Sequence, residues 1–285
     1  MVEKVRPQDS NIDAWGLTHR GKVRADNQDH FFLGALSRGI RLDGTSIDED
    51  GQRMLHVERL GSLAMVADGV GGRAGGEEAA RLAVQELVSS VSRSFHDAEH
   101  AEADDPDVFS RVLHDAALAC HESLLKKAEH AGDGRSFATT LTLFLGLWPH
   151  AYLLQVGDSR CYIYQDGALT QISRDQTWAQ DLIDDGTLTQ TVAERGKWAN
   201  VLSSAMGSTQ AAPVVTRFLR DWGSVLLFCT DGLTKHVSDE VIEQRLSSMR
   251  SAREVAEHLL QDALDGGGTD NITLIVGRSV PPTED

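Results

Sequence analysis

Several short apolar runs of this chain stop or start at an aspartate, and this pattern restricts how the chain can fold. Each run is rich in β-branched or large apolar residues, which predicts a buried strand. The runs are Ser62–Ala67 before Asp68, Ala151–Val156 before Asp158, Val225–Thr230 before Asp231, and Ile272–Val276 after Asp270. One Asp beside a Gly is ordinary turn chemistry. Its repetition at otherwise apolar strand ends suggests a further role, since aspartate is a poor strand residue.

Convergence of these strand ends would bring carboxylates together. Such carboxylates repel one another, and cations are needed to make their burial tolerable. All the candidate ligand atoms are oxygens, and neither His nor Cys accompanies them. That donor set disfavours structural zinc and favours hard ions such as Mg²⁺ or Mn²⁺.

Helical patterns alternate in blocks with the predicted strands. Apolar residues between Phe109 and Leu124 recur at spacings of three and four, and Val255–Leu264 repeats that pattern. A further helix is expected to start near Gly75. Because strands and helices do not alternate one for one, the sequence predicts an α+β fold with antiparallel sheets and outer helices, rather than a doubly wound parallel sheet.

Composition excludes several classes of function. The chain has 285 residues, and no Pro-, Ser- or Gln-rich stretch divides it, so residues 1–285 are expected to form a single domain. Its formal net charge of -16 opposes binding to nucleic acids and to anionic membranes. No apolar run is long enough to span a bilayer, and Met1–Ser10 has no signal-peptide core. We expect a cytoplasmic protein whose three cysteines are free core residues.

Short motifs with these aspartates occur in an order that resembles a known family, the bacterial form of the type-2C, or PPM, metal-dependent serine/threonine protein phosphatases. The motifs are Arg24–Asp29 (RADNQD), Ala67–Gly72 (ADGVGG), Ala138–Leu141 (ATTL), Val156–Arg160 (VGDSR), Thr230–Leu233 (TDGL) and Gly268–Thr273 (GTDNIT). The resemblance covers about residues 14–277. It implies a β-sandwich of two antiparallel sheets flanked by helices on both sides (α-β-β-α), with a flap at about 175–207.

The resemblance also implies a set of metal ligands. Asp68 would bridge two Mn²⁺ or Mg²⁺ ions, and the Gly69 carbonyl would hold one of them. Asp231 and Asp270 would complete the protein ligands of the first ion. Asp158 would help to hold a third ion and would share Asp231 with it.

Further roles follow from the same resemblance. Arg24 would clamp the substrate phosphate, since a guanidinium can bind two phosphate oxygens at once, and it forms the catalytic set together with Asp68 and Asp231. Asp29 would orient metal-bound water, and Asn271 would support the ligands from behind.

The chain departs from the family pattern at two positions. Gln28 stands where Glu is common, so the second ion would be held mostly through water. Val70 stands where animal members have a His proposed as the general acid, and Val cannot donate a proton. The sequence does not identify another general acid.

The activity implied is hydrolysis of phosphoserine and phosphothreonine on proteins, by direct attack of a metal-bridging hydroxide. The expected partners are phosphorylated proteins, those of a Hanks-type kinase, and the protein is expected to be a monomer. The main alternative is a catalytically weak relative that binds phosphoproteins as a regulatory module. A metal-dependent phosphodiesterase or nuclease is a second alternative, which the acidic charge disfavours.

Overall fold

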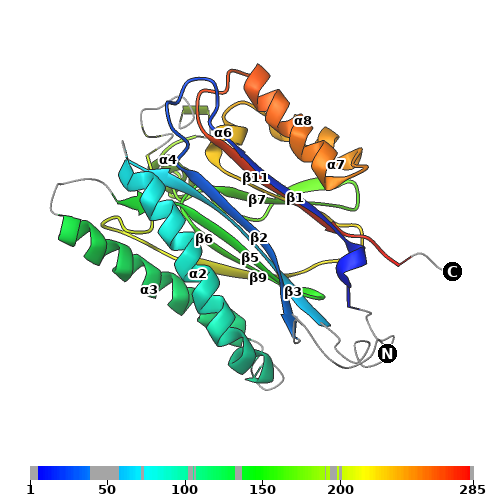
Figure 1. Ribbon diagram of the computed structural model, residues 1–285. Coiled ribbons are helices and arrows are strands. Elements are labelled where there is room, and N and C mark those ends of the chain that lie inside the picture. Colours follow the sequence, from blue (N-terminus) through cyan, green and yellow to red (C-terminus); the bar gives the residue numbers. More distant parts are fainter. Residues whose placement is uncertain are drawn as a thin grey trace, which may run out of the picture.

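The computed structural model describes residues 6–38, 58–71, 74–101, 105, 107–131, 137–189, 191–192, 198 and 201–282. Within them, two antiparallel sheets are stacked face to face, with a helical pair on each outer face (Figure 1). The first sheet has the strand order β1-β11-β10-β7-β8. Its strands are β1 (Ile12–His19), β7 (Arg160–Gln165), β8 (Ala168–Gln171), β10 (Val225–Cys229) and β11 (Ile272–Ser279).

The second sheet has the strand order β2-β3-β5-β6-β9, and the short β4 pairs with the end of β3. Its strands are β2 (Asp29–Arg38), β3 (Glu58–Val70), β4 (Ala138–Thr139), β5 (Leu141–Leu147), β6 (His150–Val156) and β9 (Val214–Leu219). The apolar run 138–147 was expected as one strand. It is divided at Thr140, whose backbone N–H instead donates to the Asp68 carbonyl (2.9 Å).

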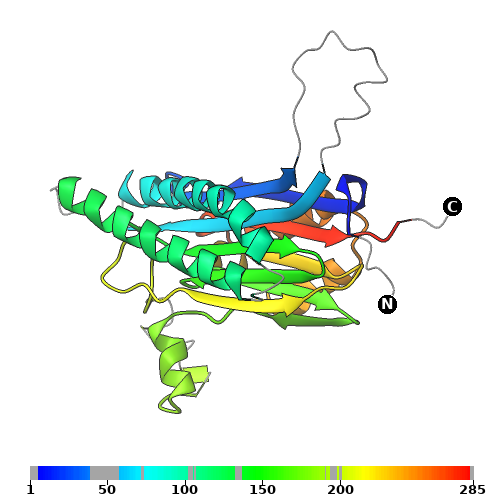
Figure 2. The same cartoon turned by 90° about the horizontal axis from the view of Figure 1, so that it is seen from below.

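The helices cover the outer faces of the sheets. On the second sheet lie α2 (Ala74–Ala101) and α3 (Val108–Ala131). On the first sheet lie α6 (Asp231–Thr234), α7 (Asp239–Ser247) and α8 (Ala252–Asp265). A 3₁₀ turn, η1 (Asp9–Asn11), precedes β1, and α4 (Trp178–Asp184) lies outside the stacked sheets (Figure 2). The predicted fold class, the long helices and their boundaries near Gly75 and Gly266 agree with this arrangement.

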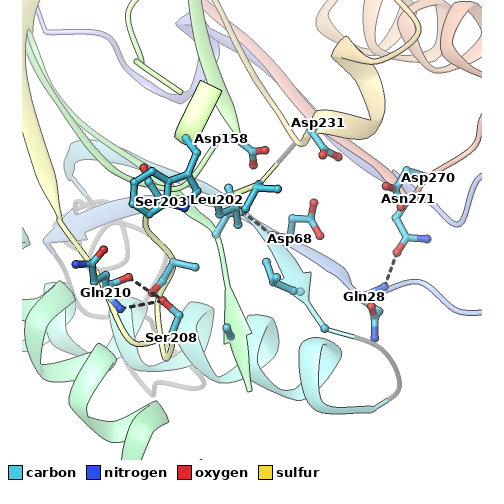
Figure 3. Close-up of a pocket in the computed structure, with 18 of the residues that line it drawn as sticks. Gln28, Asp68, Asp158, Leu202, Ser203, Ser208, Gln210, Asp231, Asp270 and Asn271 are labelled. Carbon is cyan, nitrogen blue, oxygen red and sulfur yellow. Dashed lines mark hydrogen bonds between the residues drawn. The ribbon is translucent and has the colours of Figure 1, made fainter. Parts of the chain in front are cut away.

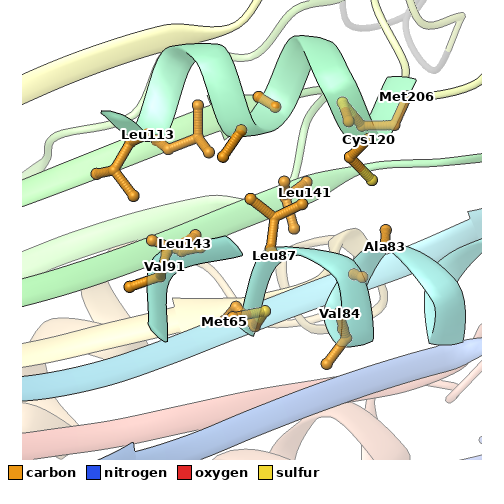
Figure 4. Close-up of a cluster of buried hydrophobic side chains, with 14 of the residues drawn as sticks. Met65, Ala83, Val84, Leu87, Val91, Leu113, Cys120, Leu141, Leu143 and Met206 are labelled. Atoms are coloured by element: carbon orange, nitrogen blue, oxygen red, sulfur yellow. The ribbon is translucent and has the colours of Figure 1, made fainter. Parts of the chain in front are cut away.

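Buried apolar side chains form three layers. Between α2, α3 and the second sheet lie residues such as Leu87, Leu113 and Leu143 (Figure 4). A second layer lies between α7, α8 and the first sheet. A third lies between the sheets, where Phe144 and Phe228 have ring centroids 5.4 Å apart. These layers exclude water from the sheet faces, so polar groups gather where the strands end.

The cysteines agree with the expectation, since Cys120, Cys161 and Cys229 are buried free thiols. A hairpin turn joins β7 to β8 through Asp166, whose φ is 53°, and Gly167, whose φ is 83°. Among the described helices, none is long and apolar enough to cross a membrane.

Arg220 is a buried charge at the edge of the sandwich, just after β9. Its residue is 7% exposed, and its Nε has no hydrogen-bond partner among the described residues. Burial, together with the charge of Arg59, lowers the pKa of Arg220 to about 10. The guanidinium lies against aromatic rings, with Cζ 5.0 Å from the centre of the Phe144 ring and 5.6 Å from that of Trp148.

We expect Arg220→Met to leave the free energy of unfolding unchanged or to raise it by up to about 3 kcal/mol, because a buried charge without a paired carboxylate costs desolvation energy. Urea denaturation measures this change. The exposed Arg217→Met on the same strand is the control and should shift stability by less than about 0.5 kcal/mol. A marked loss of stability in Arg220→Met would contradict the prediction.

Candidate active site

The aspartates predicted at strand ends line one pocket. This cavity of about 700 Å³ is lined by Arg24, Gln28, Asp68, Gly69, Asp158, Asp231, Lys235, Asp270 and Asn271, among others. The carboxylates of Asp68, Asp158 and Asp231 are directed toward the same space (Figure 3). The convergence that the sequence suggested is therefore present, and it involves both sheets.

Strand register explains why these residues meet. In the second sheet Asp29, the first residue of β2, is paired with Asp68 near the end of β3. In the first sheet β10 runs antiparallel to β11, so Asp231 just after β10 lies near Asp270 just before β11. Asp158 follows the end of β6. One edge of the sandwich thus collects strand ends that are far apart in the sequence.

Hydrogen bonds fix the backbone at Asp68. Its N–H donates to Thr140 Oγ1 (3.0 Å), and its carbonyl accepts from Thr139 Oγ1 (2.8 Å). The next residue, Gly69, has no room for a side chain, since a Cβ there would lie 2.4 Å from the backbone of Gly76. Thr139 and Thr140 are buried, and their hydroxyl groups position the backbone of Asp68.

A second network joins the two sheets beneath the pocket. Asp29 is buried, and its Oδ2 accepts from Thr230 Oγ1 (2.8 Å), while its Oδ1 has no partner among the described residues. Asn271 Oδ1 accepts from the Gln28 N–H (2.9 Å), and its Nδ2 donates to the carbonyls of Arg20 and Asp26 (2.9 Å each). Asn271 therefore holds the loop that carries Arg24.

The carboxylates strongly disfavour each other's charge. Burial raises the pKa of Asp68 well above its usual range, and the charges of Asp29, Asp231, Asp158 and Asp270 add to the shift. Burial, followed by the charge of Asp231, raises the pKa of Asp158 to about 7. The pKa values of Asp29 (to about 7) and Asp231 are raised in the same way, chiefly by burial. A cluster of this kind needs positive charge to remain ionised.

Two side-chain cations supply part of that charge. Arg24 forms a two-point contact with Asp270, with Nε 2.7 Å from Oδ1 and the terminal nitrogen 2.9 Å from Oδ2. Lys235 Nζ lies 2.6 Å from Asp231 Oδ2 and 2.8 Å from Asp270 Oδ2. Burial opposes the ionisation of Asp270, but the hydrogen bonds from Lys235 and Arg24 outweigh it and lower its pKa.

Sequence reasoning did not single out Lys235. The only signal available was its spacing, because a residue four positions after Asp231 lies on the same face of a helix that starts there. Arg24 was expected to clamp a phosphate. In the structure Arg24 lines the same pocket, and its guanidinium group binds the carboxylate of Asp270.

The donor set fits a divalent cation, although the ligands are not yet arranged around one. All the convergent groups are oxygen donors, and Asp231 Oδ1 is a buried acceptor without a partner among the described residues. Within the described part of the chain, however, no three His, Cys, Asp or Glu side chains are grouped closely enough to hold a metal ion. The ion pairs of Asp231 and Asp270 with Lys235 and Arg24 occupy oxygens that an ion would need.

The segment predicted as a flap contributes to one wall of the pocket. Trp178 at the start of α4 lines the cavity together with Val201, Leu202 and Ser203. The side chain of Thr177 caps this helix by accepting from the Gln180 N–H (3.2 Å).

Comparisons with known proteins place the chain in a family. A model of the family described as protein phosphatase 2C matches residues 46–266. The serine/threonine protein phosphatase PstP of Mycobacterium tuberculosis is 32% identical over 264 residues, which cover 92% of this chain and 44% of PstP. The serine/threonine phosphatase stp of Listeria monocytogenes is 27% identical over 262 residues, covering 91% of this chain and 92% of stp. The chain thus spans less than half the length of PstP.

Solved structures agree with these matches. A crystal structure of M. tuberculosis PstP has a TM-score of 0.73 at 30% identity and covers 95% of this chain and 99% of that chain. The catalytic domain of PstP in complex with two manganese ions has a TM-score of 0.69 at 29% identity, with coverage of 95% and 99%. Taken with the arrangement of the aspartates, the family match over residues 46–266 shows that the chain belongs to the protein phosphatase 2C family.

Proposed function

We propose that the protein is a metal-dependent phosphatase that removes phosphate from phosphoserine and phosphothreonine of other proteins. The observation that carries the proposal is the convergence of Asp68, Asp158, Asp231 and Asp270 with Arg24 in one pocket. The relatives' names and the manganese-bound catalytic domain of PstP support the same activity and the same class of ion.

In this proposal, Asp68 would bind two Mn²⁺ or Mg²⁺ ions, the Gly69 carbonyl would bind one of them, and Asp231 and Asp270 would complete the protein ligands of the first. Asp158 would help to hold a third ion and would share Asp231 with it. When bound, the ions supply an activated water and offset the negative charge of the phosphate. Asp29, which is buried beneath the pocket, would orient metal-bound water. Gln28 contributes no charge, so fewer carboxylates attract the second ion.

Arg24 binds the substrate phosphate. Its side chain is 55% exposed, and it already forms a two-point contact with a carboxylate, the geometry in which a guanidinium also binds two phosphate oxygens. Exchange of Asp270 for phosphate would free Asp270 for an ion and position the phosphorus for in-line attack. No covalent phosphoenzyme is expected, because none of the described residues that line the pocket is a Cys or a His, so its serines, Ser203 and Ser208, have no imidazole base beside them.

The alternative is a phosphoprotein-binding relative with little turnover. The neutral Gln28 and the pairing of Asp231 and Asp270 with side-chain cations favour it. The two functions differ in turnover, since a binding module would retain affinity for a phosphopeptide without releasing phosphate. For either function we propose phosphorylated proteins as partners, specifically those of a Hanks-type kinase, and a monomeric single domain.

We expect phosphate release from a phosphothreonine peptide to depend on Mn²⁺ and to stop when EDTA is added. Asp231→Asn should lower kcat on the order of 100-fold or more, because a neutral amide is a poor ligand for a hard cation. Release of inorganic phosphate measures both effects.

The matched control is Asp262→Asn, which makes the same change in an ion pair with Arg245 on the outer helices. It should leave turnover near the wild-type value. Activity that persists in EDTA, or that Asp231→Asn retains, would refute the metal-dependent mechanism.

Arg24→Ala is expected to raise the KM for the phosphothreonine peptide about tenfold or more, since a charge-assisted two-point contact with phosphate is lost. Arg24→Lys should recover only part of the loss, because an ammonium keeps the charge but lacks the planar fork. Steady-state kinetics at saturating Mn²⁺ distinguish the two variants. An unchanged KM in Arg24→Ala would show that the phosphate binds elsewhere.

A further inference from the structure

Lys235 places an ammonium group inside the carboxylate cluster. Its Nζ contacts Asp231 Oδ2 (2.6 Å) and Asp270 Oδ2 (2.8 Å), and its side chain is 28% exposed. Asp270 Oδ2 also accepts from Arg24 (2.9 Å). One ammonium thus bridges the two aspartates that the proposed function assigns to the first metal ion.

The position of Lys235 is fixed more firmly than that of Arg24. Asp231 begins α6, and the Lys235 N–H closes this helical turn by donating to the Asp231 carbonyl (2.9 Å). The turn is pressed against the start of β11, since a Cβ on Gly232 would lie 1.8 Å from the Asn271 carbonyl oxygen. Helix geometry therefore keeps the base of the Lys235 side chain beside Asp231, whatever else binds in the pocket.

Lys235 is the cationic partner of both aspartates, with Nζ within 2.8 Å of a carboxylate oxygen of each. An ammonium is a compact point charge on a flexible stem, so it can leave the carboxylates without leaving the pocket. A metal ion at Asp231 and Asp270 would have to displace this ion pair and would then remain near a like charge.

We infer that Lys235 is a built-in counter-cation, which competes with a metal ion for Asp231 and Asp270 and thereby lowers the affinity of the site for that ion. The inference rests on the proposed function, because it assigns these two aspartates as ligands. It also gives Lys235 a second role, which is to offset the repulsion among the carboxylates before an ion binds.

The test is Mn²⁺ titration of the full chain by isothermal titration calorimetry, in the absence of substrate. Lys235→Gln should bind its tightest Mn²⁺ ion at least tenfold more strongly than the wild type, since the competing charge is gone. Lys235→Arg, which keeps the charge, should stay within about threefold of the wild type. Lys126→Gln removes a lysine that is 70% exposed on α3 and should bind Mn²⁺ like the wild type.

Thermal unfolding provides a second readout that does not need activity. Without metal, Lys235→Gln should melt below the wild type, because the carboxylates lose their counter-charge. With saturating Mn²⁺ it should gain more in Tm than the wild type gains, since tighter binding to the native state stabilises it more. Both measurements also show whether the variant is folded.

The outcomes separate this inference from the proposed function. If the wild type binds Mn²⁺ and Lys235→Gln binds it equally or more weakly, the counter-cation role is wrong and the metal-dependent function stands. If neither protein binds Mn²⁺, or if Asp231→Asn binds it as well as the wild type, the ligand assignment fails and the inference fails with it. Tighter binding in Lys235→Arg would also overturn the inference, because charge would then not be the cause.

Discussion

Repulsion among carboxylates at one edge of the sandwich is the constraint to which the surrounding structure responds. Burial raises the pKa of Asp68, and the charges of the neighbouring aspartates (Asp29, Asp231, Asp158 and Asp270) raise it further. The ionisation of Asp68 therefore depends on the charges of its neighbours. Such an arrangement is unfavourable in a metal-free protein unless positive charge lies nearby. Arg24 and Lys235 both provide it at Asp270, and each does so with an ion pair that a bound metal would have to break.

The apolar layers make this costly cluster possible. The strands are held by side chains such as Leu143 and Phe144, whose burial stabilises the fold without any contribution from the pocket. Threonine hydroxyls then connect the strand ends to each other. Thr140 forms a hydrogen bond with the backbone of Asp68, and Thr230 forms one with the side chain of Asp29. Neutral hydroxyl groups thus fix the positions of these two aspartates, and the carboxylates of the pocket can interact with a bound ligand.

The sequence predicts the features that depend on residues close together in the chain better than those that depend on residues far apart. The buried strands and the apolar stripe ending near Leu124 follow from local patterns, and both are present. Strand β2 was not predicted, because only partly buried residues such as Phe31 and Phe32 distinguish it from a loop. The pairing of Asp29 with Asp68 depends on register between strands, which no local pattern specifies. Lys235 was missed for a related reason, since its partner Asp270 lies 35 positions away.

Two residues of the pocket act on metal binding in the same direction. Gln28 replaces a position where Glu is common and so removes a negative charge from the pocket. Lys235 adds a positive charge that contacts Asp231 and Asp270 directly. Both changes weaken the electrostatic attraction of the pocket for divalent cations, while the oxygen ligands themselves are kept. Metal affinity, rather than the identity of the ligands, is therefore the property in which this site should differ most from one that has Glu at position 28 and no lysine at position 235.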